Sequence, residues 1–318
     1  MLTGVGLRGE VLWGGDSRGW AGVGGGLENG GMGLSVGWSG PVTGDAPVGV
    51  LVGGALAKGA ARLQRAVRMV EKDEDDAIHQ VRVSCRRLRS NLKLFKKVLA
   101  GGWSAELRAE LAGLALACGE ARDLEVIAAL VQETAGGEDD AAQVELISGT
   151  LRAGLADAAS RANTVVTSDE TAALLIRLQQ TAAAPELKPR ADERCADVLP
   201  ELLAGAVGVF TQEADKLQPW TPDDDWHEVR LLAKRARYAA KTCAAVLGAE
   251  AEATAVQAAK YQELLGQHQD HCAAADALVA LLPAAEPPLA FTLGRLVERH
   301  RAARKPLREE FLTLYHRS

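Results

Sequence analysis

The sequence gathers basic side chains in one short stretch, IHQVRVSCRRLRSNLKLFKK, which runs from Ile78 to Lys97 and contains no acidic residue. On an α-helix, which turns about 100° per residue, a row of these side chains falls along one face at alternating spacings of 3 and 4. Guanidinium and ammonium groups in such a row can hold the oxygens of successive phosphate groups. We call this row the first stripe, and it consists of His79, Arg82, Arg86, Arg89, Lys93 and then Lys96 or Lys97.

An apolar row runs beside the first stripe on the same expected helix. Its spacings of 4, 3, 4, 3 and 4 are typical of a face packed against a core, and its members are Val81, Cys85, Leu88, Leu92, Phe95 and Leu99. Within the helix no carboxylate offsets the stripe, although like charges four residues apart repel each other. Two interpretations stay open: carboxylates of another helix neutralise the stripe, or the stripe binds an anion.

The basic pattern returns in WHEVRLLAKRARYAAK, from Trp226 to Lys241, at a constant offset of 148 residues. A second match, GEARD at 119–123 and GQHQD at 266–270, has an offset of 147. Two features that repeat at nearly one offset indicate duplication of a unit of about 130 to 150 residues. In a duplicated bundle the two rows could face each other across a shared groove. The second stripe consists of His227, Arg230, Lys234, Arg237 and Lys241.

The motif pair HQVRVSCRRLRSNLKLF and WHEVRLLAKRARYAAK, with LACGEARDLEVI and LLGQHQDHCAAADAL, resembles the CHAD family, the conserved histidine α-helical domain. The resemblance covers residues 47–316 and implies an all-α domain of two pseudo-symmetric four-helix repeats around a basic central channel. It also implies binding of inorganic polyphosphate by the two stripes, and some bacterial members associate with polyhydroxyalkanoate granules. The second stripe departs slightly from the first, with Lys234 in place of Arg86 and alanines in place of Lys96 and Lys97, which would make it the weaker half.

Each stripe begins with a histidine near the start of its helix, where backbone N–H groups favour anions. An imidazole at His79 or His227 can donate to a phosphate, and nearby negative charge favours its protonated form. The alternative is that each histidine packs at the helix start or bonds to the acidic turn before it. Further candidates, each equally compatible with ordinary surface or packing, are Lys96, Lys97, Arg122, Tyr238, Lys260 and His268, the row Arg62, Arg65 and Arg68, and the cluster Arg301, Arg304 and Lys305.

Motifs of several enzyme classes are missing from the sequence. It contains no G-x-x-x-x-G-K-[ST] phosphate loop, no H-E-x-x-H zinc helix and no G-x-S-x-G elbow. We therefore predict no catalytic residue, no cofactor and no resident metal, although His268, Asp270, His271 and Cys272 lie close enough in sequence to trap a stray ion. A triphosphate-tunnel hydrolase, a frequent fusion partner of the CHAD family, needs a β-barrel and alternating glutamates. Neither is found, so a stand-alone form is expected.

The chain of 318 residues reads as all-α after a glycine-rich beginning. Residues 1–46 hold 16 of the 33 glycines, cannot build a core, and are predicted to be a disordered extension. The CHAD-like region is expected at 47–316, with repeats at 47–183 and 192–316. The acidic residues Asp75 and Asp76 are candidate caps of the first basic helix. Helices are predicted near 48–71, from that acidic turn to 99, and near 103–118, 121–133, 139–164, 168–183, 192–217, 224–247, 250–265, 267–282 and 287–315.

Composition limits the remaining function classes. The five cysteines are scattered, with no C-x-x-C pair, which fits buried thiols in a reducing cytoplasm. No membrane span or signal peptide is predicted, so a cytoplasmic or granule-associated location is expected. The alternatives to polyphosphate are nucleic acid, for which the electrostatics are the same, and a granule or scaffold partner. Nucleic acid is disfavoured because the chain carries a formal charge of -6 and the stripes lack interleaved aromatic rings.

Overall fold

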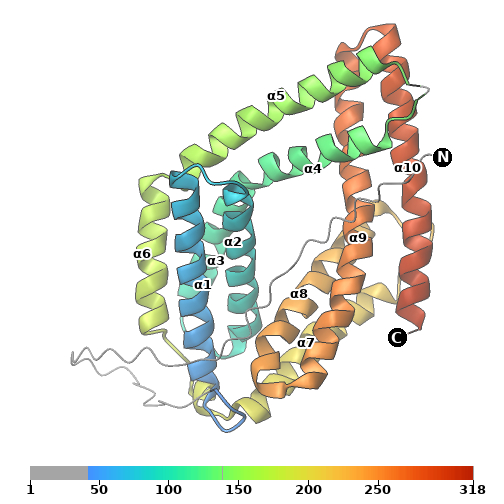
Figure 1. Cartoon of the computed structure of the whole chain (residues 1–318). Helices are drawn as coiled ribbons and strands as arrows, with labels where there is room; N and C mark the ends of the chain where they lie inside the picture. The colour runs from blue at the N-terminus through green and yellow to red at the C-terminus, as the bar shows by residue number, and fades with distance from the viewer. Residues whose placement is uncertain (1–41, 138, 318) are drawn as a thin grey trace, which may run out of the picture.

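The protein is described by a computed structural model over residues 42–137 and 139–317. These residues form helices and no β-strand, apart from isolated bridges at Pro47–Arg194 and Leu99–Leu187 (Figure 1). The predicted all-α class is confirmed. The α-helices are α1 (Val48–Glu71), α2 (Ala77–Leu94), α3 (Trp103–Ala117), α4 (Gly119–Thr134), α5 (Ala141–Val166), α6 (Asp169–Ala183), α7 (Cys195–Ala214), α8 (Asp223–Leu247), α9 (Ala249–Leu281) and α10 (Pro287–His316), with 3-10 turns η1 (Phe95–Lys97), η2 (Pro189–Asp192) and η3 (Leu282–Ala284).

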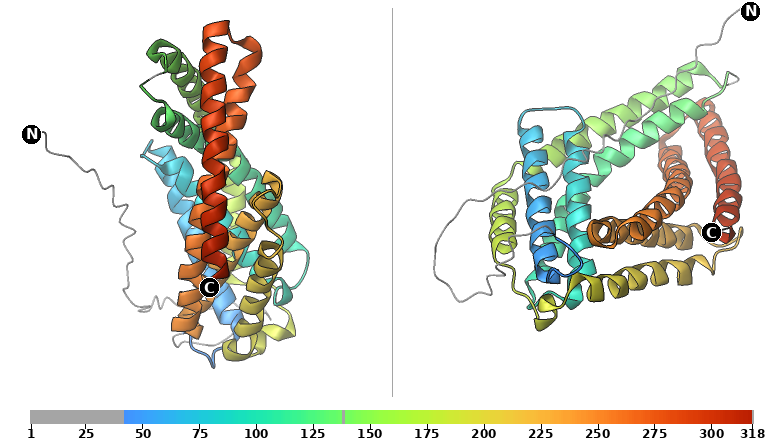
Figure 2. Two further views of the ribbon diagram at one scale, coloured as in Figure 1. Left: turned by 90° about the vertical axis from the view of Figure 1, so that its right-hand side faces the viewer. Right: turned by 60° about the horizontal axis from the view of Figure 1, so that its bottom comes forward.

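The helices follow one another around a ring, as the right-hand view of Figure 2 shows. Helix α1 packs on α2 and α6, and α2 packs on α3. The pair α4 and α5 extends from this group to α9 and α10 (Figure 1). Helix α8 packs between α7 and α9 and also contacts α2. This last contact brings together the two helices that carry the basic stripes.

Three apolar clusters hold the ring together. The first joins α1, α2, α3, α6 and the start of α7, the second joins α7 to α10, and the third joins α4 and α5 to α9 and α10. Every member of the apolar row predicted for the first basic helix is buried in the first cluster, with at most 3% of its surface exposed. Burial of this row fixes the rotation of α2 and therefore the direction in which the first stripe points.

Two predicted helix boundaries differ from the structure. Helix α2 ends at Leu94 rather than near Leu99, and a 3-10 turn follows. The backbone then leaves the helix because Lys188 N donates to the carbonyl of Val98 at 2.8 Å. The predicted break near Gly266 is absent, since α9 is one helix of 33 residues. Buried leucines on the N-terminal side of Gly266 supply packing energy that outweighs the helix cost of a glycine, about 1 kcal/mol.

The acidic turns do not cap the basic helices in the predicted way. Asp76 stands at the N-cap of α2, but its φ is +61°, and its carboxylate accepts from the side chain of Gln80 rather than from a backbone N–H. The residue at the N-cap of α8 is Pro222, and the three aspartates that follow lie in the first turn. These carboxylates still favour the helix starts through the helix dipole.

The glycine-rich extension predicted for 1–46 falls mostly on residues 1–41, outside the described residues. Two of its last residues, Gly44 and Ala46, bond to the start of α7. Cys195 N donates to Ala46 O at 2.8 Å, and Ala196 N donates to Gly44 O at 2.9 Å. Ala46 is fully buried, so the packed region begins before the predicted boundary at Pro47.

All five cysteines are buried and unpaired, as expected for small apolar side chains. Across the described ranges, none of the helices combines the length and the apolar character that crossing a bilayer requires.

Candidate anion-binding site

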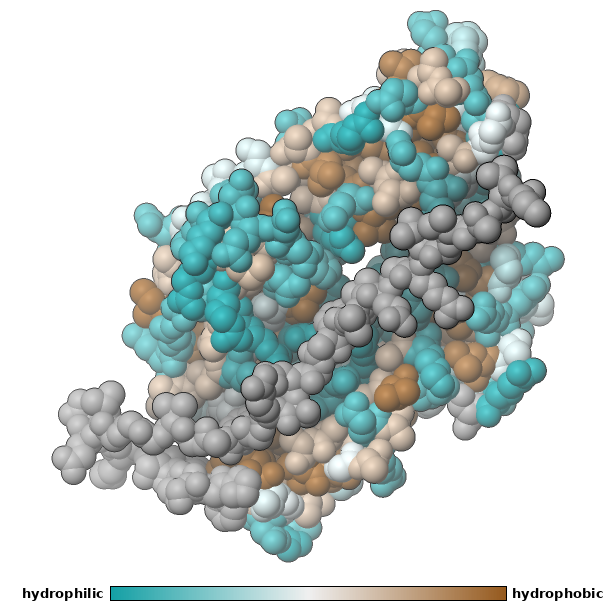
Figure 3. All heavy atoms as spheres, viewed as in Figure 1, coloured by the Kyte–Doolittle hydropathy of each residue, from teal (hydrophilic) through white to brown (hydrophobic). Residues whose placement is uncertain are grey.

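The two stripes approach each other where α2 contacts α8. The side chain at the centre is Lys234, which is only 6% exposed. Burial and the positive charges of Arg86 and Arg230 lower the pKa of Lys234 to about 6. The face shown in Figure 3 is largely hydrophilic around a hollow in its middle. We call the four cations at this contact the crossing cluster: Arg82, Arg86, Arg230 and Lys234.

The arginines of the crossing cluster repel one another between the helices. Burial lowers the pKa of Arg86 and, likewise, that of Arg230. The charges of Arg86 and Arg82 on α2 lower the pKa of Arg230 on α8 further. Cations from helices about 150 residues apart in sequence therefore lie within electrostatic reach of each other.

Each half contributes one glycine and one aspartate to the crossing cluster. Arg82 donates through Nη1 to the carbonyl of Gly119 at 2.9 Å and to Asp123 Oδ1 at 2.8 Å. In the other half, a Cβ added to Gly266 would lie 3.9 Å from Nε of Arg230. Burial raises the pKa of the facing Asp270 carboxyl, and the charge of Arg230 opposes that rise. In both segments, GEARD and GQHQD, the glycine lies beside an arginine of a basic helix: Arg82 near Gly119 and Arg230 near Gly266.

Asp123 and Asp270 bear on whether carboxylates of other helices neutralise the basic stripes. Partner carboxylates do reach the stripes, but Asp123 and Asp270 face four cations. The aspartates were recognisable in the sequence as repeat positions, yet nothing in the spacing identified them as partners of the arginines. Arg122, a further candidate from the sequence, donates to Glu125 at 2.8 Å.

The later part of the first stripe meets further cations from other helices. Burial lowers the pKa of Lys93, as do the charges of Arg235 on α8 and Arg108 on α3. Arg89 contributes to lowering the pKa of Arg235. Arg108 was not recognised in the sequence as a site residue. Arg235 lies 148 residues after Arg87, at the offset of the two basic motifs.

Several buried nitrogen donors at the stripes have no hydrogen-bond partner in the described part of the chain. A buried donor left unpaired costs about 1 to 3 kcal/mol, so each is a place where a bound anion would be stabilised. The unpaired donors at or beside the stripes are Arg89 Nε, Arg108 Nε and Arg230 Nε, joined by His79 Nδ1 when that nitrogen carries the proton.

The two leading histidines have different surroundings. His79 is half-buried beside the acidic turn, and burial lowers its pKa, while the carboxylate of Asp76 opposes that shift. His227 Nδ1 lies 2.7 Å from Gln269 Oε1. The imidazole of His79 is therefore favoured in its neutral form without an anion beside it.

The ends of the stripes lie away from the crossing cluster. Lys96 and Lys97 are exposed on η1, and Lys97 pairs with Glu201 at 2.8 Å. Arg237 donates to Gln262 at 3.2 Å, and Lys241 to Glu252 at 3.3 Å, both on α9. Tyr238 lies near Arg86, whose pKa it raises against the effect of burial. The exposed Lys260 lines a pocket that also contains the ends of the second stripe and two glutamates.

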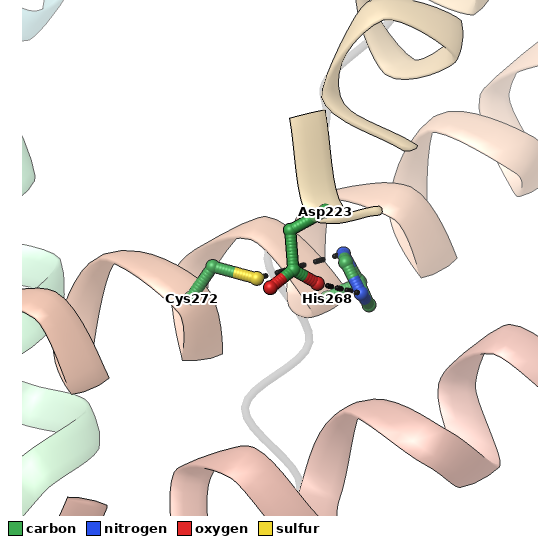
Figure 4. Close-up of side chains that lie close together, drawn as sticks. All are labelled: Asp223, His268 and Cys272. Atoms are coloured by element: carbon green, nitrogen blue, oxygen red, sulfur yellow. Dashed lines mark hydrogen bonds and ion pairs between the residues drawn. The ribbon is translucent and has the colours of Figure 1, made fainter. Parts of the chain in front are cut away.

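His268 lies in a different environment from the one predicted. It is 2% exposed, and its Nε2 accepts a hydrogen bond from Nε of Arg308 at 3.0 Å. Figure 4 shows it beside Asp223 and Cys272. The potential metal-ligand atoms of these three side chains lie within 4.8 Å of one another. The group of residues that the sequence suggested for a stray ion is therefore wrong in part, because Asp223 from α8 takes the place of Asp270 and His271.

Arginine side chains already bond to the potential metal-ligand atoms of Asp223 and His268. Arg304 and Arg308 both bond to the carboxylate of Asp223. Burial and the charge of Arg308 lower the pKa of His268 to about 4. Two guanidinium groups thus stand where a metal ion would bind, and the network ties α8, α9 and α10 together.

Comparison with family models and with known proteins identifies relatives of this chain. A family model described as CHAD domain matches residues 54–279. Two Mycobacterium tuberculosis proteins, named Uncharacterized protein MT2285 and Uncharacterized protein Rv2226, are each 29% identical over 256 residues, covering 76% of this chain and 48% of the relative. The chain thus spans about half the length of these curated relatives.

Two solved structures share the fold. PptA from Streptomyces chartreusis is 24% identical with a TM-score of 0.71, and the match covers 85% of this chain and 99% of PptA. The CHAD domain from the plant Ricinus communis is 22% identical with a TM-score of 0.73, covering 88% of this chain and 95% of that domain. At these identities the likeness concerns the arrangement of the helices.

Proposed function

The chain belongs to the CHAD domain family, and on that premise we propose that it binds inorganic polyphosphate at the α2–α8 crossing without turning it over. The ligand would contact the crossing cluster first and then the flanking parts of both stripes. The CHAD-like region would act as two repeats, 47–183 and 192–316, that each supply one stripe. Because the curated relatives are about twice as long, the proposal concerns this chain alone.

The excess of cations at the α2–α8 crossing carries the proposal. Three arginines and Lys234 face two carboxylates, and burial together with the charges of Arg86 and Arg230 lowers the pKa of Lys234 to about 6, so that the free cluster does not hold a fourth positive charge at neutral pH. Holding like charges together in a poorly hydrated place costs free energy. A polyanion bound there would remove this repulsion and would pair with the free donors of Arg89 and Arg230.

Polyphosphate suits this arrangement better than nucleic acid. It is a flexible chain of charged phosphate units with no base or sugar to recognise, so a row of cations is a sufficient receptor. Arginine can hold two phosphate oxygens at once, and lysine adds a mobile point charge. Binding of single-stranded nucleic acid usually adds aromatic platforms for the bases, whereas most of the aromatic ring contacts here belong to the core of α7 to α10.

The first experiment is a titration with long-chain polyphosphate of the wild type and of two triple alanine variants. Each replaced side chain removes a charged hydrogen bond worth about 1.5 to 3 kcal/mol, so either variant should bind at least a hundred-fold more weakly at low salt. The variants replace Arg82, Arg86 and Arg89 in one case, and Arg230, Lys234 and Arg237 in the other.

The matched control removes three arginines from α5 and α6, where all three are more than half exposed and ion-paired: Arg152, Arg161 and Arg177. This control should bind like the wild type at about 0.15 M salt, where the Debye length is about 8 Å. Equal weakening in all three variants would mean that only net charge matters. Competition by duplex and single-stranded DNA in the same titration separates polyphosphate from nucleic acid.

Catalysis is tested separately. The protein is incubated with polyphosphate and Mg²⁺, and released phosphate is measured over time. We expect no release above background. Release that rises with protein concentration and disappears in the stripe variants would contradict the proposal of binding without turnover.

A further inference from the structure

A second basic cavity lies between α1, α2 and α8 and has a volume of about 510 Å³. The face of α2 that lines it carries Ser84, Arg87 and Asn91 rather than the first stripe. No aspartate or glutamate is among its lining residues. Its cations come from three helices: Lys58, Arg62, Arg87, Arg237 and Lys241.

The close approach of α1 to α2 brings two of these cations to the cavity. A Cβ on Gly59 would overlap the side chain of Leu88 on α2, so glycine is required at this contact. Lys58 and Arg62 stand immediately before and three residues after Gly59, and both line the cavity. On the far wall Thr242 of α8 donates to Asn91 of α2 at 3.1 Å, which fixes the two helices relative to each other.

The positive charge of the cavity is not offset on its α1 and α2 walls. Burial lowers the pKa of Arg62, and the charges of Arg87 and Arg65 lower it further. In the described ranges, Lys58, Arg62 and Arg87 form no hydrogen bond or ion pair with another side chain. A half-buried arginine that faces another arginine without a carboxylate is unfavourable unless an anion enters.

The cavity is continuous with the second stripe. Arg237 and Lys241 belong to both, and Lys241 lies seven residues after Lys234, about 10 Å along the helix. Tyr238, on the same wall, adds a hydroxyl group. A chain of phosphates held at the crossing cluster can therefore continue along α8 toward α1.

We infer that this cavity binds the continuation of the polyphosphate chain, so that α1, through Lys58 and Arg62, is the third helix of the binding site. The inference rests on the proposed function. It adds two residues that neither stripe contains and assigns a binding role to the start of the basic row of α1. Arg65 and Arg68 of the same row are exposed, do not line the cavity, and are assigned none.

The test compares two double variants that remove equal charge from the same helix. Lys58→Ala/Arg62→Ala alters the cavity, and Arg65→Ala/Arg68→Ala is the matched control. Each is titrated with long-chain polyphosphate at about 0.15 M salt, where charges outside the cavity are largely screened. We expect the cavity variant to bind at least ten-fold more weakly, with the slope of log affinity against log salt reduced by about two. The control should lose much less affinity, because Arg65 acts on the cavity only through its charge on Arg62 and neither replaced residue lines the cavity.

Three results would decide against the inference. If both double variants bind like the wild type, the cavity takes no phosphate. If both weaken equally, the effect is one of net charge. If the wild type itself does not bind polyphosphate, the proposed function fails and this inference with it. Circular dichroism melting verifies that the variants are folded, and Arg62→Lys, which keeps the charge, should retain most of the affinity.

Discussion

Replacing Lys234 with Met is expected to abolish a pH dependence of polyphosphate binding that the wild type shows. Lys234 is 6% exposed, and burial together with Arg86 and Arg230 lowers its pKa from 10.5 to about 6. At pH 8 its amine is therefore neutral in the free protein. A phosphate beside it favours the ammonium form, so binding at pH 8 should take up close to one proton per site.

The size of the effect follows from the same shift. If bound phosphate restores the pKa of the amine to its ordinary value of 10.5, the complex holds one proton more than the free protein between pH 7 and pH 9. Each pH unit then costs about 1.36 kcal/mol of binding, so the wild-type affinity should fall about ten-fold per pH unit. The affinity of Lys234→Met should be nearly constant over this range. At pH 6 the Lys234→Met variant should bind polyphosphate more weakly than the wild type. The difference in affinity between the two should become smaller as the pH rises.

The free energy of unfolding depends on pH in the opposite direction to the polyphosphate affinity. The folded pKa of Lys234 lies below its unfolded value of 10.5, so between about pH 6 and 10.5 the unfolded chain holds a proton that the folded chain lacks. The free energy of unfolding of the wild type therefore rises with pH across this window. At pH 7 the cost to the folded state is about 5 kcal/mol, and Lys234→Met should melt at a higher temperature than the wild type.

The assay is isothermal titration calorimetry at pH 8 in two buffers with different ionisation enthalpies, which counts the protons taken up. Arg65→Ala/Arg68→Ala is the control, because these exposed residues lie outside the crossing cluster, and this variant should take up as many protons as the wild type. A wild type that binds polyphosphate at pH 8 without proton uptake would refute the reasoning. So would a Lys234→Met variant with the same uptake as the wild type.

Two further predictions concern the surroundings of the site. Asp123→Asn should raise polyphosphate affinity several-fold in the same titration, because its carboxylate competes for Arg82 at 2.8 Å; weaker binding would mean that Asp123 positions the arginine for the ligand. Gly59→Val should lower the free energy of unfolding by about 1 to 3 kcal/mol because its Cβ would overlap Leu88. Gly53→Val, where an added Cβ meets no atom within 4 Å, is its control in thermal melting, and equal melting of the two would contradict the packing argument.

The sequence predicted the helices of this protein well because helix formation and amphipathic spacing are local properties. Every member of the apolar row between Val81 and Leu99 is buried, as the spacing of the row requires. The same periodicity placed the basic residues of α2 and α8 in rows. The predicted duplication rests on motif offsets of 148 and 147 residues, and recognising such offsets needs no knowledge of the fold.

Boundaries and breaks were less predictable, since they depend on contacts far along the chain. The chain leaves its helical path after η1, where Lys188 N donates to the carbonyl of Val98, and α9 continues through Gly266 because its neighbours are buried. The side chain of Asp76 could cap α2 by type, but its backbone φ of +61° directs it elsewhere. The types of the neighbouring residues in the sequence do not determine any of these three outcomes.

Tertiary structure alone decided which cations share a site. The rows were evident, but the approach of Arg86 to Lys234 depends on how α8 crosses α2, and so do the places of Arg108 and Arg235. Lys58 and Arg62 reach their cavity because α1 closes on α2 at a glycine, and His268 is buried by arginines of α10. Spacing along a chain fixes the face of a helix on which a charge lies, whereas the charges it faces are set by long-range packing.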